Sequence, residues 1–248
     1  MRVENSFIPI EGVGERTERK LWRSGVHTWD DFDGSVPGPV PAVRVESFID
    51  TARDRLSAGD AAFFAEQFPA GCEWRLYENF RESACFLDIE TTGLDKRVED
   101  VTVVSCHRDG RTRTFVRGRD LTARRLERQL LAADLLVTFN GKRFDVPFLE
   151  ESFGLDIGLP HIDLMYPCRR LDLTGGLADI ERAVGIDRDR PDLSGRDAVR
   201  LWHEYRRGDE RALETLVSYN RDDTANMERL LEYVTEHLHE ELFPAVED

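Results

Sequence analysis

Lysine and cysteine are scarce in this chain of 248 residues, and long apolar runs are missing. The four cysteines, at positions 72, 85, 106 and 168, show no CxxC spacing, so we expect reduced, buried thiols rather than a zinc site. No apolar run approaches the length of a membrane-spanning helix, about 18 residues, and the N-terminus lacks the pattern of a signal peptide. These absences predict a globular, cytoplasmic protein without disulfide bonds.

The charge of the chain is strongly one-sided. Aspartate and glutamate total 49 against 34 basic residues, the net charge is −15, and only three of the basic residues are lysine. An acidic, arginine-rich surface suits a cytosol of very high salt, where the Debye length is about 3 Å. We therefore predict a halophilic archaeal source, although GC-rich coding would also favour arginine. At such salt, binding to nucleic acid must depend on short contacts and metal ions.

Residues 1–33 are expected to form a small helical unit. In it, Gly12-Val13-Gly14 makes a tight turn before a helix, Gly25 caps the end of that helix, and Thr28 begins a short turn. The segment resembles half of a helix-hairpin-helix element, in which backbone N–H groups contact phosphate. A structural cap that uses glycine for its conformation is the alternative interpretation.

Residues 34–83 are expected to hold a linker and accessory elements. The Gly- and Pro-rich stretch over 34–43 is typical of a linker. Helices are predicted over 46–67, with a break near 57–59 and an N-cap at Asp60, and a strand is predicted over 73–80.

Strands and helices alternate in the third segment, residues 84–238. Strands are predicted over 84–91, 101–107, 112–118, 134–140 and 161–166, and helices over 121–133, 143–154, 176–184, 195–207 and 209–236. Three early strands followed by alternating helices and strands is the order of a ribonuclease H-like α/β fold. The fold prediction is a mixed sheet, an antiparallel meander plus parallel strands, flanked by helices.

The stretch 86-FLDIETTGL-94 places two acids in a strand. Side chains alternate between the faces of a strand, so Asp88 and Glu90 project to the same side, roughly 7 Å apart. Two carboxylates in an apolar setting repel each other unless a cation lies between them or one is protonated. A hard divalent cation would remove that repulsion. A solvated surface pair is the alternative interpretation.

Two later segments carry further acids. In 138-TFNGKRFDVPFL-149, Asp145 lies among apolar residues at the start of a helix, where the helix dipole could also explain it. In 219-YNRDDT-224, Tyr219 and Asp223 are four residues apart and share one helix face.

These three segments resemble, in chain order, the exonuclease motifs of the DEDD 3′–5′ exonuclease superfamily, related to DnaQ. The motifs are DxExTGL, NGxxFDxPFL and YxxxD, and the last one marks the tyrosine subclass. The resemblance covers about residues 84–236. With the N-terminal unit included, the chain looks like the YprB-like ribonuclease H-type family.

The resemblance implies that Asp88, Glu90, Asp145 and Asp223 bind two divalent ions, Mg²⁺ or Mn²⁺, about 3.5–4 Å apart. Tyr219 is expected to orient the attacking water, because a tyrosine of ordinary pKa near 10 is a poor base at neutral pH. The implied substrate is the 3′ end of single-stranded DNA or RNA, and protein partners are not predicted.

Other residues are assigned to substrate or support. Thr91, Thr92, Leu94 and Asn140 are expected to contact the terminal nucleotide, although Asn140 could instead only make the strand-to-helix turn. For Asp163, a helix cap or loop role is favoured over support of the metal site. Two further hypotheses remain open: an endonuclease or structure-specific nuclease using the same residues, and a non-catalytic nucleic-acid-binding module.

Overall fold

The computed structural model describes residues 1–35 and 40–243. Residue contacts group the chain into two compact units: Met1–Arg81 together with the end of the chain from Val234 (unit 1), and Glu82–Tyr233 (unit 2). The expected linker over 34–43 falls partly on residues 36–39, outside the described residues. The division into three segments stays a prediction.

Unit 2 is built on a five-stranded sheet. Its strands, in the spatial order β3-β2-β1-β4-β5, are β1 (Ala84–Thr91), β2 (Val101–Arg108), β3 (Arg111–Val116), β4 (Leu135–Thr138) and β5 (His161–Asp163). The pairs β1–β2 and β2–β3 are antiparallel, whereas β1–β4 and β4–β5 are parallel. The predicted mixed sheet is therefore confirmed.

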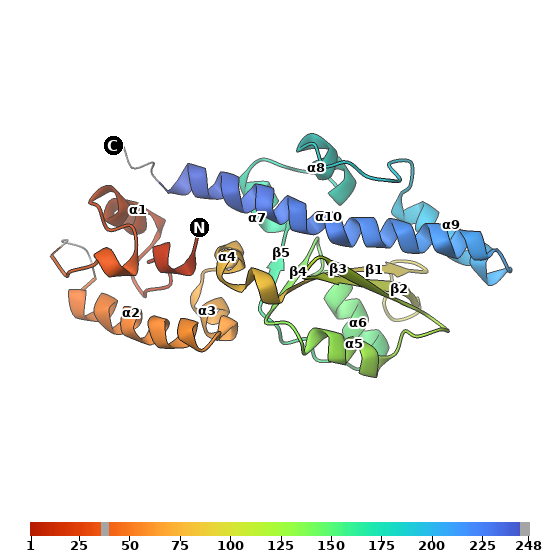
Figure 1. The fold of residues 1–248 in the computed structure, drawn as a ribbon, viewed down its shortest axis with the longest axis horizontal. Coiled ribbons are helices and arrows are strands. Elements are labelled where there is room, and N and C mark those ends of the chain that lie inside the picture. The colour runs from red at the N-terminus through yellow and green to blue at the C-terminus, as the bar shows by residue number, and fades with distance from the viewer. Residues whose placement is uncertain (36–39, 244–248) are drawn as a thin grey trace. The chain divides into compact units, whose positions relative to one another are not determined.

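Helices cover both faces of this sheet: α5 (Ala123–Leu130) and α6 (Asp145–Phe153) on one, α9 (Gly195–Arg206) and α10 (Glu210–Leu242) on the other (Figure 1). Two shorter helices, α7 (Met165–Arg170) and α8 (Leu177–Ala183), lie between β5 and α9 in the chain. Leu87 and Ile89 of β1 belong to the core under α5 and α6, whereas Val103 of β2 packs with apolar residues of α9 and α10. The predicted strand over 161–166 is shorter than expected, because α7 begins at Met165.

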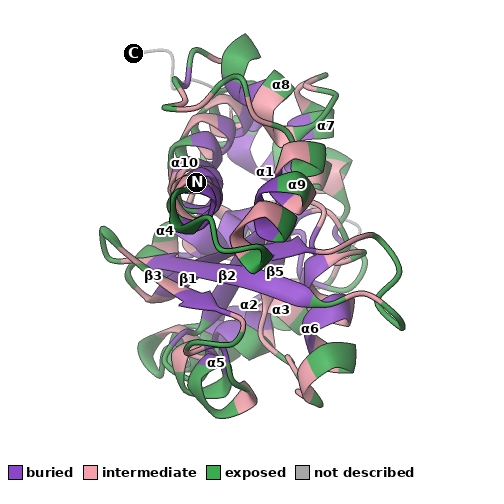
Figure 2. Ribbon diagram, turned by 90° about the vertical axis from the view of Figure 1, so that its right-hand side faces the viewer, coloured by how far each residue is buried: buried purple, intermediate pink, exposed green. Residues whose placement is uncertain are grey.

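Strands β1, β2 and β4 form the buried centre of unit 2 (Figure 2). In β1 every residue is buried except Asp88, which is half-buried, and in β2 only Arg108 at the end is not fully buried. A sheet buried on both faces provides a rigid support, because its side chains interdigitate with helices on either side. The acids of β1 are therefore held in a fixed position.

Unit 1 is helical. Its elements are η1 (Val3–Asn5), α1 (Glu15–Arg23), η2 (Trp29–Asp31), α2 (Ala42–Ser57), α3 (Ala61–Gln67), η3 (Glu73–Leu76) and α4 (Tyr77–Phe80), and η4 (Arg81–Ser83) leads into unit 2. The predicted break between helices is confirmed: Asp60 caps α3 by accepting the Phe63 N–H at 2.9 Å.

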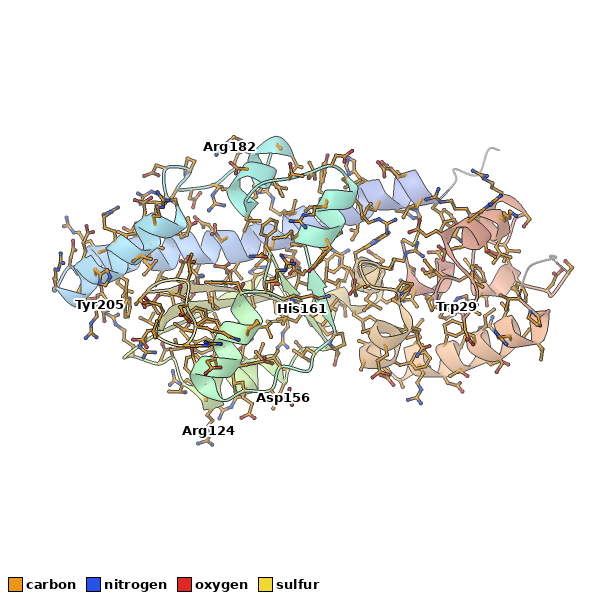
Figure 3. All side chains as sticks on the ribbon, turned by 180° about the vertical axis from the view of Figure 1, so that it is seen from behind. Trp29, Arg124, Asp156, His161, Arg182 and Tyr205 are labelled. Atoms are coloured by element: carbon orange, nitrogen blue, oxygen red, sulfur yellow. The ribbon has the colours of Figure 1, made fainter. Side chains whose placement is uncertain are left out.

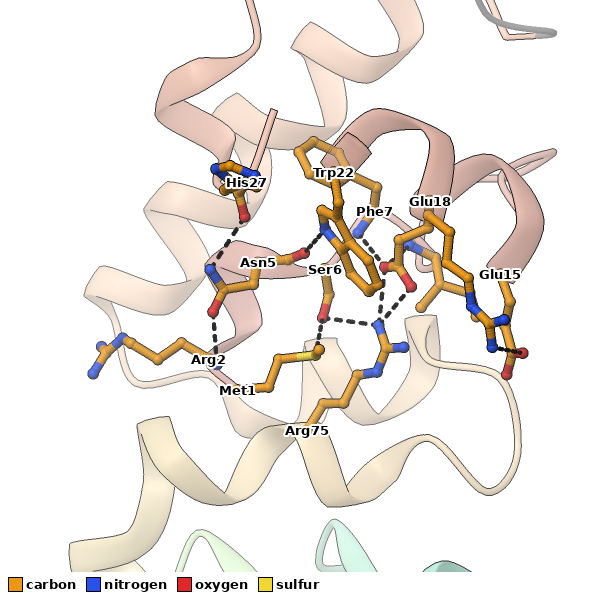
Figure 4. Close-up of polar contacts among 12 residues, drawn as sticks. Met1, Arg2, Asn5, Ser6, Phe7, Glu15, Glu18, Trp22, His27 and Arg75 are labelled. Atoms are coloured by element: carbon orange, nitrogen blue, oxygen red, sulfur yellow. Dashed lines mark hydrogen bonds and ion pairs between the residues drawn. The ribbon is translucent and has the colours of Figure 1, made fainter. Parts of the chain in front are cut away.

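The predicted strand over 73–80 is wrong, because these residues form η3 and α4. Trp74, Arg75, Leu76 and Tyr77 are buried in succession. Arg75 contributes to the packing of the unit through Glu18 (Figure 4). Its Nη1 atom donates to both Glu18 oxygens at 2.9 Å, and Glu18 also accepts the N–H groups of Phe7 and Ile8.

The Gly12-Val13-Gly14 turn leads into α1. Gly12 has φ of +88°, Val13 is buried, and Gly14 is the residue before the helix. Glu11 and Glu15 flank the turn, and they pair with Arg44 and Arg19 at 3.6 Å. The geometry agrees with a turn that uses glycine for its conformation, and phosphate contact stays a prediction. Within the described residues, no helix has the length and apolar character that crossing a membrane requires.

Candidate metal centre

Asp88 and Glu90 lie on the central strand β1, on the face opposite Leu87 and Ile89. Asp88 pairs with Ser105 and Glu90 with Val103, and the register shifts between Glu90 and Thr91. Because Val103 packs against α9 and α10, the two acids face that layer. The same-side projection expected from strand alternation is confirmed.

Helix α10 brings a third acid to this face. Asp223 is buried, and its carboxylate, with those of Asp88 and Glu90, forms a group whose oxygen atoms lie within 4.8 Å of one another. Tyr219, one turn earlier on the same helix, is also buried. Residues more than 130 positions apart in the sequence thus converge on one point.

Asp145 lies at the start of α6, beside this group but outside it. Its Oδ1 atom accepts the Ile89 N–H at 3.2 Å, so the acid is bonded to the backbone of β1 between Asp88 and Glu90. The side chain is buried and lines the same pocket as the other three acids. The structure therefore brings all four predicted acids together, with three of them closest.

Burial raises the pKa of each of the four acids, and repulsion from a nearby carboxylate adds to the rise. Burial raises the pKa of Asp88 and of Glu90 well above the ordinary values, and the charges of Asp145 and Asp223 raise both further. Burial also raises the pKa of Asp145 to about 7. The pKa of Asp223 rises to about 6, again mainly through burial, although nearby Arg188 opposes the shift.

Tyr219 stays protonated at this site. Burial raises the pKa of its hydroxyl above the ordinary value of 10, and the charges of Asp223 and Glu90 add to the effect. A hydroxyl with a raised pKa is a hydrogen-bond donor near neutral pH and not a base. Its hydrogen bond to Asp223 helps to keep that carboxylate ionised.

Arg188 is a residue of the site that the sequence analysis missed. It lies between α8 and α9, and its guanidinium pairs with both Asp223 and Glu181. The same group lies over the Tyr219 ring, 5.4 Å from the ring centre. Burial raises the pKa of Glu181 to about 7, so this acid also depends on Arg188 for its charge. No local pattern in the sequence indicates this contact.

Asn220 is a second residue that was missed. Its Nδ2 atom donates to the Asp88 Oδ2 atom at 2.6 Å, and the side chain is fully buried. Asn220 follows Tyr219 directly in the motif YxxxD, so its proximity to the site could have been noticed from the sequence.

A pocket of about 750 Å³ opens onto the four acids. Thr91, Leu94 and Asn140 line it, as does Arg196 at the start of α9. Leu94 is 86% exposed, which is unusual for a large apolar side chain. Thr92 is not among the lining residues: its hydroxyl donates to Glu99 and accepts the Asp100 N–H at 2.9 Å.

The turn between β4 and α6 positions both Asn140 and Asp145. Asn140 has φ of +63°, a left-handed conformation that asparagine tolerates. At Gly141, a Cβ atom would meet the Cβ atom of Thr138 at 2.5 Å, so only glycine fits there. Asn140 therefore makes the turn and also lines the pocket.

Buried Asp163 supports this turn. Its Oδ1 atom accepts the N–H groups of Asn140 at 2.8 Å and Met165 at 3.1 Å, and its Oδ2 atom accepts that of Lys142 at 3.1 Å. The favoured loop and cap role is therefore confirmed. His161 on β5 (Figure 3) contacts the Thr138 hydroxyl at 2.8 Å, and burial lowers its pKa to about 3.

The acids fit a hard divalent cation. Carboxylate oxygens are the donors that Mg²⁺ and Mn²⁺ prefer, and three of them lie close enough to share an ion. The raised pKa values of Asp88 and Glu90 reflect burial first and the charges of neighbouring acids second, and a bound cation would oppose both effects. Asp88, Glu90 and Asp223, with Asp145 beside them, are the residues that would hold metal.

Several solved structures are similar to part of this chain at low sequence identity. A family B DNA polymerase from the hyperthermophilic archaeon Pyrobaculum calidifontis is 21% identical, with a TM-score of 0.49; the match covers 62% of this chain and 24% of the polymerase. A structure described as the apo form of a nuclease is 20% identical, with a TM-score of 0.48, over 64% of this chain and 75% of the other. Brucella melitensis NrnC is 18% identical, with a TM-score of 0.36, over 69% of this chain and 93% of NrnC.

The matched region thus spans about a quarter of the length of the polymerase. The comparison with curated proteins found no match. A family model described as the RNase_H superfamily matches residues 85–235, which include all four acids and Tyr219. The chain therefore belongs to the RNase_H superfamily, a superfamily of nucleases.

Proposed function

We propose that the chain is a divalent-metal-dependent 3′–5′ exonuclease that hydrolyses phosphodiester bonds at single-stranded DNA or RNA ends. The observation that supports this most directly is the convergence of Asp88, Glu90 and Asp223 within 4.8 Å, beside Asp145 and at the base of an open pocket. Exonuclease action and its polarity rest on the resemblance of the three motifs to DEDD exonucleases.

In this proposal, the four acids hold two ions, Mg²⁺ or Mn²⁺. When bound, the ions offset the carboxylate charge and stabilise the negative charge that develops on the scissile phosphate. Asp88 and Glu90 are presented by a rigid strand, and Asp145 is fixed to that strand through the Ile89 N–H. This rigidity matters because catalysis depends on donors and charges that are positioned before the reaction.

Tyr219 orients the attacking water by hydrogen bonding. Its raised pKa leaves the hydroxyl protonated, so the hydroxyl orients the water and does not accept a proton from it. The Arg188 guanidinium over the ring holds Tyr219 in place and links α10 to the segment before α9.

The pocket rim receives the terminal nucleotide. Exposed Leu94 packs against a base, Thr91 and Asn140 contact sugar or phosphate, and Arg196 offers a charged donor for phosphate. Thr92 is proposed to contact the substrate only after its bonds to the 99–100 segment rearrange, so it acts first as a support for that loop.

Degradation of end-labelled single-stranded DNA and RNA tests the proposal. Reactions at high KCl with Mg²⁺ or Mn²⁺ should release mononucleotides from the 3′ end, and a chelator should abolish release. Asp88→Asn should lower the rate at least about 100-fold, because it removes a charge at the centre of the metal site. A parent-like rate in this variant would contradict the assignment of the metal centre.

Two further measurements separate the alternatives. A circular single strand should survive, since an exonuclease needs an end, and its cleavage would favour an endonuclease. Calorimetry that found no binding of divalent ions would favour a non-catalytic nucleic-acid-binding module.

A further inference from the structure

Unit 2 carries a second hollow, away from the metal centre. Its volume is about 800 Å³, and arginines dominate its lining: Arg108, Arg111, Arg113, Arg128 and Arg221. Asp109 is the acid among the lining residues. In a chain with a net charge of −15, five arginines against one acid is a strong local reversal of charge. We call this region the arginine hollow.

The strands and α5 build the arginine hollow at the free edge of the sheet. The hairpin between β2 and β3 turns on Asp109 and Gly110, both with positive φ (+51° and +65°), as a tight two-residue turn requires. This turn sets Arg108 opposite Arg111, and Arg113 opposite Cys106. Arg108, Arg111 and Arg113 therefore lie on one face of the hairpin, next to Arg128 of α5.

The hollow lies apart from the metal centre. Cys106, the partner of Arg113, packs in the core under α5 and α6, whereas Asp88 and Glu90 lie on the opposite face of the sheet. Arg108 is also beyond His107, the partner of Phe86, so it lies toward the start of β1 rather than its end. The arginines of β2, β3 and α5 therefore lie on the face of the sheet opposite the acids and toward the other end of the strands, whereas Arg221 joins the hollow from exposed α10 surface.

Local contacts neutralise little of this charge. Asp120 lines a smaller neighbouring cavity with Arg113 and Arg128, but it pairs with Arg125 at 3.1 Å. Arg108 and Arg113 bond to uncharged groups: the Ala132 carbonyl and Gln129. Arg111 and Arg128 are exposed. Like charges directly opposite each other on neighbouring strands destabilise a sheet, so this arrangement has a cost that an anion would remove.

Protection of the sheet edge is the simpler explanation, because charges on an edge strand prevent pairing with other chains. It does not account for the sign of the charges. Acids outnumber basic residues in this chain by 49 to 34, and an acid would protect β3 equally well. It also does not account for Arg128 and Arg221, which come from helices α5 and α10.

We infer that the arginine hollow binds the phosphodiester backbone of a single-stranded nucleic acid. Guanidinium groups match phosphate geometry with two parallel hydrogen bonds and stay charged at any physiological pH. Five of them spread over a hairpin and two helices suit several successive phosphates better than one small anion. The lining contains no aromatic side chain for base stacking, so the contacts are independent of sequence.

This inference rests on the proposed function for the identity of its ligand. It adds a distal contact for the part of a long substrate that does not occupy the metal centre. Affinity should therefore grow with the length of the oligomer, because only a long strand reaches both sites.

The test is fluorescence anisotropy of labelled DNA and RNA strands, a trinucleotide and a long oligomer, with the full chain and a chelator present to prevent hydrolysis. Arg111→Ala combined with Arg128→Ala should weaken binding of the long oligomer about ten-fold. It should also lower the slope of log affinity against log salt by about 0.7 for each lost phosphate contact. The trinucleotide should lose less affinity than the long oligomer.

The matched control is Arg206→Ala combined with Arg207→Ala, which removes the same charge from exposed residues at the end of α9. This control should bind the long oligomer like the parent. An equal loss of oligomer affinity in both variants, or no loss in either, would overturn the inference. So would inorganic phosphate that displaces the long oligomer when the two ligands are present at equal concentration.

Two readouts keep the inference independent of folding and of the proposed function. The Arg111 and Arg128 variant should unfold at the same or a higher temperature than the parent, because repulsion is removed. If long strands bind through the hollow but are never hydrolysed with Mg²⁺ or Mn²⁺, the proposed exonuclease function fails and the inference stands. If they are hydrolysed but bind the variant as tightly as the parent, the inference alone fails.

Discussion

At the residue scale, the ionised forms of the four acids of the metal centre are electrostatically unfavourable. Each has a raised pKa, and burial is the first cause in every case. Without a cation, the four carboxyl groups must either stay partly protonated or repel one another when ionised. A divalent ion would stabilise the ionised carboxylates. The Arg188 guanidinium opposes the rise in the pKa of Asp223 through their ion pair.

The pKa of Asp145 leads to a prediction about stability and pH. A carboxyl with a pKa of about 7 when folded and about 4 when unfolded binds more protons in the folded chain. Without divalent ions, the free energy of unfolding should therefore fall as the pH rises from about 4 to about 7. Asp145→Asn should flatten this fall and raise stability at pH 7 by about 1–4 kcal/mol. Urea unfolding in a chelator, at several pH values, measures the effect.

A matched control uses Asp156→Asn, since Asp156 is exposed after α6 and outside the pocket lining (Figure 3). This change should leave the pH dependence as in the parent. An unchanged slope in Asp145→Asn would show that the carboxyl is not buried as described.

Tyr219→Phe separates the hydroxyl from the ring. The ring should keep its place beside the Arg188 guanidinium, so the fold should persist, and Arg188 still favours the ionised form of Asp223. The value of kcat should fall about 10–100-fold, as expected for the loss of one hydrogen bond to a charged partner. Initial rates on a labelled single strand provide the measurement.

Tyr205→Phe is the control for this change. Tyr205 lies on α9, outside the pocket lining, and its hydroxyl accepts a hydrogen bond from the Arg119 Nε–H group at 3.2 Å. Only the Tyr219 variant should lose activity; equal rates in the two variants would exclude a role for the Tyr219 hydroxyl in orienting water.

At the element scale, the turn between β4 and α6 decides where Asp145 lies. The turn is held by Asp163 on β5, which accepts the N–H groups of Asn140 and Lys142. It also requires glycine at 141, where the chain passes directly over Thr138. A short connection with so many constraints fixes the start of α6 relative to β1.

Gly141→Ala should therefore destabilise unit 2 by about 1–3 kcal/mol, the usual cost of forcing extra atoms into a packed region. The new Cβ atom would meet the Thr138 side chain, and the turn must shift to avoid it. Because Asp145 would move with the turn, the affinity for Mg²⁺ should also fall. Denaturant unfolding and calorimetry measure the two effects.

Gly158→Ala provides the comparison. A Cβ atom there meets nothing within 4 Å, and the residue lies in the same unit, before β5. Its stability should remain within about 0.5 kcal/mol of the parent. A similar loss in both variants would mean that backbone flexibility, and not the contact with Thr138, is the reason.

At the scale of the whole molecule, net charge is the dominant feature. Many arginines form exposed ion pairs, such as Arg53 with Asp30 at 2.5 Å and Arg200 with Glu204 at 2.9 Å. Pairs of this kind contribute at most about 1 kcal/mol each and weaken with salt. The excess of acids that remains, −15, repels at low salt.

Repulsion should outweigh the loss of exposed pairs, so salt should stabilise the protein. We expect the free energy of unfolding to rise by about 1 kcal/mol or more between about 0.1 M and about 1 M KCl. Urea unfolding in KCl measures this, and KCl is preferable to sulfate, which strengthens apolar burial in any protein. A decrease with KCl would show that the ion pairs dominate and would weaken the prediction of a halophilic source.

Local features of the sequence were enough to locate the acids. The strand predicted over 84–91 is observed with the same bounds as β1. Tyr219 and Asp223 lie in α10, which extends beyond the helix predicted over 209–236. Alternation along a strand is a property of the backbone, so the shared face of Asp88 and Glu90 followed without knowledge of the fold.

Contacts between distant segments could not be obtained in this way. Arg188 meets Asp223 and Glu181 only because the segment between α8 and α9 packs on α10, and the arginine hollow gathers residues from β2, β3, α5 and α10. The segment 73–80 is helical, and its Arg75 is buried against Glu18, a residue of another helix that local composition does not indicate. Periodicity reports which face of an element is apolar, whereas partners across elements depend on how those faces pack.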